Sequence, residues 1–378
     1  MSNANGSRIQ SIDFVRGVVM IIMALDHIRE LFHESALLGD PTNLETTTPA
    51  LFFTRWVTHL CAPIFVFLSG TSVYLSFRRH ADTSSTKKFL ITRGLWLILL
   101  EFTVVNFGIW FDIHFEVFLA QVIAAIGLGL ILLGILLGTP SRILGLIGVF
   151  IISTYSFFPL SQLVNPGLIP LPWGSNLLVG YPPIPWIAIL LVGYWAGTLM
   201  ELEKAKRSRT FLLIGVGCLV SFILVRLVNG YGDPAAWGIQ KNDLYTFLSF
   251  INVTKYPPSL LFDLLMLGSM FLLLSVAERL SGRVFGIVKL YGSVPLFYYL
   301  LHWYIIHLLL FLVLFFQGFT VADFRFGFNF GRPEAPSGLP LWGVYAVWAG
   351  VVALLYPLCR WYSRYKSTHK EKKWLRYL

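Results

Sequence analysis

Long apolar segments alternate with short polar ones along the whole chain. Each apolar segment runs for about 20 residues, the length that an α-helix needs to cross the hydrocarbon core of a bilayer. The pattern predicts an all-α, polytopic membrane protein with a single integral membrane domain, residues 1–378. We expect about ten membrane helices in one bundle, near residues 12–32, 51–77, 89–109, 114–137, 142–158, 184–200, 210–229, 258–277, 291–316 and 340–360.

Composition strengthens this prediction. Hydrophobic residues make up 56% of the chain and charged residues only 13%, about half of the charged fraction that soluble domains carry. These values exclude a water-soluble enzyme of this length. Three cysteines, Cys61, Cys218 and Cys359, each lie inside an apolar segment. A free thiol behaves there as a small hydrophobe, so no disulfide is expected.

The distribution of Lys and Arg predicts the orientation of the bundle. Successive connections between helices lie on opposite sides of the membrane. With this assignment, 21 of the 29 basic residues fall on one side and 7 on the other, and Arg16 lies inside the first helix. The positive-inside rule therefore places both termini in the cytoplasm, which agrees with an even number of spans. The net charge of +10 follows from this topology, so no nucleic-acid partner is expected.

Polar side chains within the apolar segments are predicted to lie at one depth. Ionisable groups at membrane depth are costly, and each one is therefore a functional hypothesis. Asp26, His27 and His33 belong to the outer part of the first helix, and Arg55 and His59 to the outer end of the second. Four further helices carry polar residues at a central to outer level, which predicts a shared polar cavity: Glu101, Gln121, Asp263 and His302.

Asp26 and His27 are the pair that most strongly indicates chemistry. A carboxylate can orient an imidazole and stabilise its protonated form, as a general base requires. A structural interpretation stays open, because a lone membrane histidine such as His307 more often joins two helices by a hydrogen bond. Arginines near the outer surface, such as Arg55, can also extend to the headgroups.

Several sequence segments resemble one family of membrane enzymes. RIQSIDFVRGVVMIIMALDH and RWVTHLCAPIFVFLSGTSVYLS, followed by YPPIPWIAILLVGYWAG and YGSVPLFYYLLHW, resemble the heparan-alpha-glucosaminide N-acetyltransferase catalytic-domain family, and more narrowly its bacterial branch. The similar segments extend from Arg8 to Leu378. The first segment is also similar to the start of O-acyltransferases that modify bacterial polysaccharides.

This resemblance implies a multi-pass enzyme of the bacterial cytoplasmic (inner) membrane. Such an enzyme takes an acetyl group from cytosolic acetyl-CoA and delivers it to an extracytoplasmic glycan, lipid-linked sugar or small acceptor. In lysosomal members an asparagine on the first helix and a histidine in the following luminal loop are implicated. The asparagine falls on His27 here, the nearest candidate for the histidine is His33, and His59 falls where the relatives carry aspartate.

In an acyl transfer of this kind, each of the polar residues named above would have a role. A thioester is already activated, so the enzyme needs a base for the acceptor and positive charge for the developing oxyanion. We expect His27, oriented by Asp26, to be the base and Arg55 or His59 to stabilise the oxyanion. Glu101, Gln121, Asp263 and His302 would contact the acceptor. The donor's phosphates would contact basic residues on the cytoplasmic side: Arg78, Arg79, Lys87, Lys88 and Arg93.

Two other classes of function remain open. A proton-coupled transporter of a small solute would also place Asp, Glu and His at membrane depth, although transporters of this kind often show internal repeats and none is visible. A non-catalytic subunit of an envelope-modifying complex would not need the polar cluster. The expected partners are the lipid bilayer, the coenzyme A donor and the acceptor, with no metal ion; a homodimer is compatible with the sequence.

Overall fold

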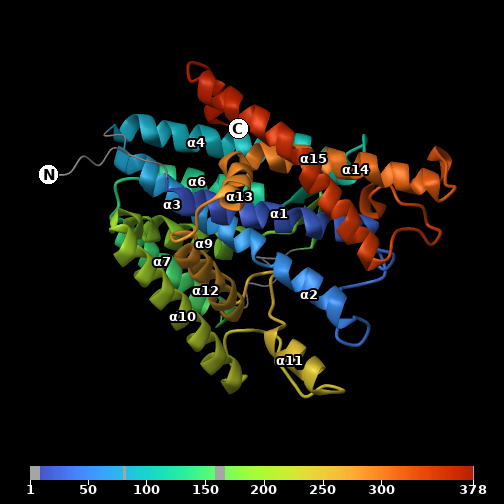
Figure 1. Cartoon of the computed structure of the whole chain (residues 1–378), viewed down its shortest axis with the longest axis horizontal. Helices are drawn as coiled ribbons and strands as arrows, with labels where there is room; N and C mark the ends of the chain where they lie inside the picture. The colour runs from blue at the N-terminus through green and yellow to red at the C-terminus, as the bar shows by residue number, and fades with distance from the viewer. Residues whose placement is uncertain (1–8, 80–81, 158–166, 378) are drawn as a thin grey trace.

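The computed structural model describes residues 9–79, 82–157 and 167–377 and shows a bundle of long helices (Figure 1). The predicted all-α membrane bundle is confirmed. In the described part, seven helical segments are long and apolar enough to cross a membrane: Pro49–Arg79, Thr83–Trp110, Pro183–Glu201, Lys204–Val228, Leu260–Ala277, Pro295–Phe316 and Leu341–Thr368.

The helices follow the chain in the order α1 to α15. Their bounds are α1 Gln10–Phe32, α2 Pro49–Thr58, α3 Cys61–Arg79, α4 Thr83–Leu100, α5 Asn106–Trp110, α6 Val122–Ile135, α7 Ser141–Thr154, α9 Pro183–Ala196, α10 Lys204–Val228, α11 Asp243–Ile251, α12 Leu260–Ala277, α13 Arg283–Ser293, α14 Pro295–Phe316 and α15 Leu341–Thr368. A π-helical turn, Glu101–Val105, joins α4 to α5. Short 3-10 helices cover Tyr155–Phe157, Gly197–Glu201, Val321–Asp323, Gly327–Asn329 and Lys373–Arg376.

Each of the ten predicted segments contains a helix, but three of these helices differ from a simple apolar span. Helix α1 has 23 residues, yet it carries five charged residues. Helices α6 and α7 have 14 residues each, or about 21 Å at the α-helical rise, against roughly 30 Å of hydrocarbon. Ten crossings therefore stay a prediction. Residue 158, the end of the predicted segment 142–158, lies outside the described residues.

Three predicted helices are interrupted where the sequence pattern appears continuous. The segment 51–77 divides into α2 and α3 at His59 and Leu60. The segment 291–316 divides before Pro295, whose fixed φ and missing N–H suit the first turn of α14. In the segment 114–137, the first residues form a strand instead of a helix, because the Asp112 carboxylate accepts hydrogen bonds from the N–H groups of His114 and Glu116 at 2.8 and 2.9 Å.

A small three-stranded sheet accompanies the helices. Strand β1, Val117–Ala120, pairs in parallel with β3, Asn176–Val179, and β3 pairs antiparallel with β2, Leu168–Pro170. The backbone of Leu119 in β1 also bonds to the Asn106 side chain of α5, with N–O distances of 2.7 and 3.0 Å. The strand therefore ends against the helix that precedes it, and α6 begins only after it.

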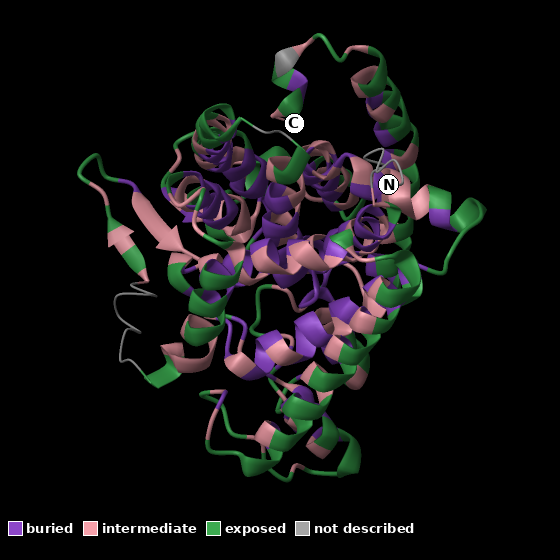
Figure 2. Cartoon of the chain, turned by 90° about the vertical axis from the view of Figure 1, so that its left-hand side faces the viewer, coloured by how far each residue is buried: buried purple, intermediate pink, exposed green. Residues whose placement is uncertain are grey.

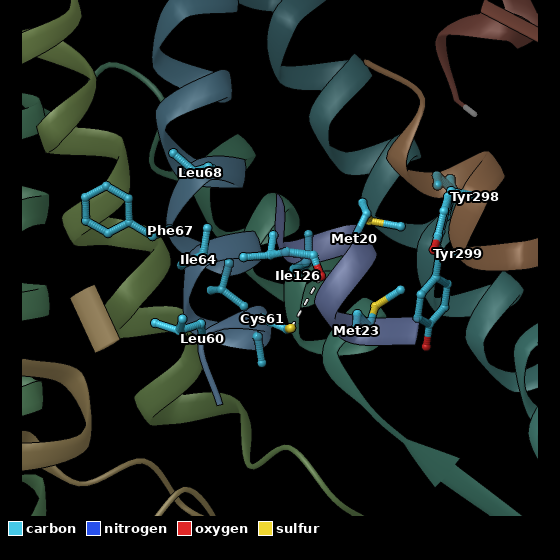
Figure 3. Packing of buried hydrophobic residues seen from close by; sticks show 14 of the residues in the cluster. Met20, Met23, Leu60, Cys61, Ile64, Phe67, Leu68, Ile126, Tyr298 and Tyr299 are labelled. Carbon is cyan, nitrogen blue, oxygen red and sulfur yellow. Dashed lines mark hydrogen bonds between the residues drawn. The ribbon is translucent and has the colours of Figure 1, made fainter. Parts of the chain in front are cut away.

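Helix α1 lies in the middle of the bundle (Figure 1), and its side chains are mostly buried. Figure 3 shows Met20 and Met23 of α1 between Cys61 of α3 and the tyrosines Tyr298 and Tyr299 of α14. The Cys61 thiol donates to the carbonyl oxygen of Val19 at 3.4 Å. Figure 2 shows exposed residues on the outer helices. Many of these are large and apolar, as a lipid-facing surface requires: Phe150, Leu213, Leu224 and Phe316.

Helices α1 and α13 approach each other closely through two glycines. A Cβ atom added to Gly17 would lie 1.9 Å from the carbonyl oxygen of Val288, and one added to Gly292 would lie 1.8 Å from the carbonyl oxygen of Asp13. Small residues at such crossings let two backbones pack together within a membrane. This contact fixes the N-terminal half of α1 against the segment that precedes α14.

The substitution Gly17→Ala is therefore expected to destabilise the protein. The new methyl group collides with backbone, which cannot move without separating the helices, and overpacking of this kind costs about 1–3 kcal/mol or more. Gly286→Ala is the matched control, because it also places a methyl group at this helix pair and no atom lies within 4 Å of that position. Thermal unfolding in detergent should show a clearly lower midpoint for Gly17→Ala only. Equal midpoints for the two variants would contradict the close approach.

Candidate active site

Two histidines from distant parts of the chain face each other inside the bundle. His27 Nδ1 of α1 lies 2.6 Å from His302 Nε2 of α14. The indole ring of Trp303 stacks on the His27 imidazole with 4.0 Å between ring centroids. His302 is fully buried, whereas His27 is partly exposed. The sequence placed both histidines at one depth, and the structure brings them into direct contact.

The hydrogen bonds of His302 decide which nitrogen atoms carry protons. His302 Nδ1 bonds to the carbonyl oxygen of Tyr299, and a carbonyl oxygen can only accept. His302 Nδ1 therefore carries a proton, and Nε2 of the neutral ring accepts from Nδ1–H of His27. The remaining nitrogen of neutral His27, Nε2, is then unprotonated, as the base in a proton transfer must be.

Asp26 lies next to His27 in the chain but bonds to different partners. Its carboxylate contacts the guanidinium of Arg55 at 2.5 Å and that of Arg29 at 3.2 Å. Successive residues on an α-helix point about 100° apart, which explains why adjacent side chains diverge. The prediction that Asp26 orients His27 by direct contact is wrong: His302 does so. Asp26 instead holds Arg55 of α2 against α1.

Lys255 and Tyr256, in the loop between α11 and α12, extend this polar cluster. Lys255 is 7% exposed, and its ammonium lies 4.9 Å from the centre of the Tyr256 ring. The Tyr256 hydroxyl lies 3.3 Å from that of Tyr181, and the charges of Lys255 and Arg55 act on it. Burial opposes ionisation of the Tyr256 phenol, yet Lys255 and Arg55 bring its pKa below the ordinary tyrosine value.

The two other predicted histidines lie at different places. His59 is 4% exposed at the break between α2 and α3, where its ring lies 5.8 Å from that of Phe262 and its Nδ1 bonds to no described residue. His33 follows the end of α1, its Nδ1 lies 2.8 Å from the hydroxyl of Ser35, and its carbonyl oxygen accepts from Arg332. Burial lowers the pKa of His33. These contacts place His33 in a loop that covers the end of α1, apart from the His27–His302 contact.

Two predicted acceptor-binding residues, Glu101 and Gln121, meet at the start of α6. The Glu101 carboxylate accepts from the backbone N–H of Ala124 at 2.8 Å, within the first turn of that helix. Gln121 precedes the helix, and its Oε1 lies 3.4 Å from the hydroxyl of Tyr299. A helix N-terminus has free N–H groups and a positive dipole end, so a carboxylate is stabilised there. Glu101 therefore has a structural partner, whereas Gln121 is linked through Tyr299 to His302.

The last predicted acceptor-binding residue, Asp263, belongs to the first turn of α12. Its side chain is 3% exposed, and its Oδ1 accepts no hydrogen bond from the described residues. It does not contact the His27–His302 pair.

The five basic residues predicted to bind the donor do not form one cluster in the described part of the chain. Arg78 at the end of α3 pairs with Glu201 at 2.8 Å, and Arg93 of α4 donates to the carbonyl oxygen of Arg376 in the C-terminal segment. Arg79, Lys87 and Lys88 are exposed. All five lie between residues 78 and 93, from the end of α3 to the middle of α4, on the side predicted to be cytoplasmic.

The arrangement provides a base beside a group of cations. The free nitrogen of His27 lies on the helix that also carries Arg29, and Arg55 and Lys255 approach from two other segments. This combination suits a reaction in which a proton leaves a nucleophile while negative charge develops nearby. Among residues 9–79, 82–157 and 167–377, no group of three or more His, Cys, Asp or Glu side chains is placed to hold a metal ion.

Comparison with known families agrees with the catalytic interpretation. The family model for the heparan-alpha-glucosaminide N-acetyltransferase catalytic domain matches residues 8–223, which is more than half of the chain. The matched part contains Asp26, His27, Arg55 and His59, whereas His302 and the loop at residues 255 and 256 lie beyond it. No curated protein matches the chain.

Proposed function

The chain belongs to the heparan-alpha-glucosaminide N-acetyltransferase catalytic-domain family, and from this membership we propose that it is a transmembrane acetyltransferase. The proposed donor is cytosolic acetyl-CoA. The proposed acceptor is an amino or hydroxyl group of an extracytoplasmic glycan or another small envelope molecule. The reaction is an acyl transfer from sulfur to nitrogen or oxygen.

His27 acts as the general base of this reaction. Its Nε2 takes the proton of the acceptor while the acceptor nitrogen or oxygen attacks the thioester carbonyl carbon. The tetrahedral intermediate carries a negative oxygen, which the guanidinium of Arg55 and the ammonium of Lys255 stabilise. The carbon–sulfur bond then breaks, and the coenzyme A sulfur takes the proton from the His27 imidazolium, so that the base is regenerated.

The observation that carries the proposal is the hydrogen-bond chain from Tyr299 through His302 to His27. It fixes the tautomer of His27 with its free nitrogen available to a substrate. Once His27 is protonated, both of its nitrogens donate, and Nε2 of His302 continues to accept from Nδ1. Trp303 holds the plane of the His27 ring. The same contacts therefore suit the neutral and the protonated form of the base.

Acetyl-CoA is expected to bind from the predicted cytoplasmic side. Its phosphates would contact exposed cations at the end of α3 and the start of α4, among which Arg79, Lys87 and Lys88 form no ion pair with a described residue. Arg78 forms an ion pair with Glu201, and Arg93 donates a hydrogen bond to the C-terminal segment. Charge-assisted contacts to phosphate are strong, and several together would fix the bulky donor.

A direct measurement of donor binding tests this proposal. At a concentration of about 100 times its Kd, acetyl-CoA should stabilise the protein by about 2.7 kcal/mol through mass action. Calorimetry should detect the binding, and the Lys87→Ala/Lys88→Ala variant should bind more weakly. Acetyl-pantetheine, which lacks the nucleotide phosphates, is the control ligand and should bind weakly to both proteins. Absence of heat and of any thermal shift at saturating acetyl-CoA would exclude this donor and favour the transporter hypothesis.

A further inference from the structure

An apolar groove runs along one side of α12, and neither His27 nor His302 lines it. Its volume is about 430 Å³, and five helices line it: α3, α7, α9, α10 and α12. The lining residues of α12 recur every three or four positions, from Leu260 to Phe271, so they share one helical face. At the α-helical rise, this face is about 16 Å long. The groove therefore follows the direction of the membrane helices.

One acidic side chain interrupts this apolar lining. Asp263 lies near the Leu260 end of the groove, is 3% exposed, and its Oδ1 has no hydrogen-bond partner among the described residues. No cationic side chain of the described chain pairs with it. A buried carboxyl oxygen without a partner has lost the hydrogen bonds that water would give it, and this loss is unfavourable. An atom of this kind inside a groove is a candidate for the position at which a ligand supplies the missing contact.

The first turn of α12 connects this groove to the candidate active site. Phe262, the residue before Asp263, is fully buried and lies 5.8 Å from the ring of His59. Because adjacent helical residues point about 100° apart, Phe262 faces the site while Asp263 faces the groove. A molecule that fills the groove would thus have one end at Leu260, close to the segment that carries Lys255 and Tyr256.

We propose that this groove holds the hydrocarbon chain of an amphiphilic acceptor, whose hydroxyl or amino group donates a hydrogen bond to Asp263. This inference rests on the proposed function and narrows its acceptor to a lipid-linked molecule. The length and apolar lining of the groove suit one extended chain that lies parallel to the membrane lipids. The lone carboxyl group favours a hydrogen-bond donor and disfavours a phosphate or carboxylate at the same position.

Photolabelling of the full-length protein in nanodiscs tests the binding site. The probe is hexadecyl glucosaminide with a diazirine in the middle of its chain, and labelled peptides are identified by mass spectrometry. Label is expected on the groove-lining parts of α10 and α12. Ile214→Trp fills the groove and should lower this label about 10-fold or more, and Cys218→Trp provides a second filling variant if the first does not fold. Asp263→Leu should lower it about 10-fold through the lost hydrogen bond.

Leu213→Trp is the matched control, because Leu213 lies on the same helix, is 62% exposed and does not line the groove. Its labelling should equal that of the natural protein. Label spread evenly over the outer helices, or unchanged by both groove-filling substitutions, would overturn the proposal.

A transfer assay separates this inference from the proposed function. Hexadecyl and methyl glucosaminide are compared as acceptors of acetyl from acetyl-CoA. The ratio of kcat/KM for the long chain over the short chain should fall about 10-fold or more in Ile214→Trp and stay constant in Leu213→Trp. A ratio that does not change in Ile214→Trp would overturn the groove as an acceptor site although transfer occurs. Failure of both acceptors with the natural protein, with the groove still labelled, would overturn the acetyltransferase proposal itself.

Discussion

The variant His27→Ala is expected to lose most acetyl transfer, by about 10²–10⁴-fold, the usual contribution of a positioned general base. The substitution removes the only nitrogen that the hydrogen bonds of His302 leave free for a substrate proton. The affinity for acetyl-CoA should change little, because the donor's phosphates are expected on the opposite side of the membrane. Initial rates at saturating donor, together with calorimetric binding of acetyl-CoA, measure the two effects separately.

His307→Ala is the control for this prediction. His307 lies five residues after His302 on α14, is fully buried, and its ring stacks on Phe111 with 4.3 Å between centroids. It does not contact His27, so its loss should lower the thermal midpoint more than it lowers turnover. If His27→Ala folds normally and transfers acetyl at nearly the natural rate while His307→Ala is inactive, the base has been assigned to the wrong residue.

The second large effect is expected from Asp26→Ala. The side chains of Asp26, Arg29 and Arg55 are between 7% and 14% exposed. Without the carboxylate, two neighbouring guanidinium groups remain largely buried and lose the ion pairs that they form with Asp26. Breaking a buried ion pair from one side typically costs about 3–5 kcal/mol. The unfolding midpoint should therefore fall markedly, and because Arg55 of α2 is no longer held against α1, acetyl transfer should fall as well.

Glu201→Ala is the matched control for Asp26→Ala, because it breaks an ion pair that lies at the surface. Glu201 also pairs with an arginine, at 2.8 Å, but the side chains of Arg78 and Glu201 are 61% and 45% exposed. Exposed pairs contribute little to stability, so the midpoint of this variant should stay close to that of the natural protein. Equal shifts for Asp26→Ala and Glu201→Ala would mean that the Asp26 cluster is solvated and has no special structural role.

The sequence predicted the depth of the site better than its contacts. Hydropathy and the basic residues give the position of each polar group along its helix, which is why His27 and His302 were expected at one level. The rotation of a helix about its own axis is set by packing against its neighbours. The pairing of His27 with His302, and of Asp26 with Arg55, therefore required the structure.

Local departures from the helical pattern account for the other differences. Glu101 was expected in the polar cavity, but the strand Val117–Ala120 delays the start of α6 and brings its free N–H groups to this carboxylate. Lys255 and Tyr256 have no helical periodicity that would place them at membrane depth. Only the fold of the loop before α12 brings them to Arg55. The groove beside Asp263 combines five helices and has no signature in any one of them.

The proposed function requires that the protein move an acetyl group across the membrane from donor to acceptor. Proteoliposomes with one orientation of the protein test it, with labelled acetyl-CoA supplied on the predicted cytoplasmic side and glucosamine enclosed in the opposite compartment. We expect labelled N-acetylglucosamine in the glucosamine compartment, and none with His27→Ala. Product that forms only when donor and acceptor share one compartment, or proton movement without acetyl transfer, would contradict it.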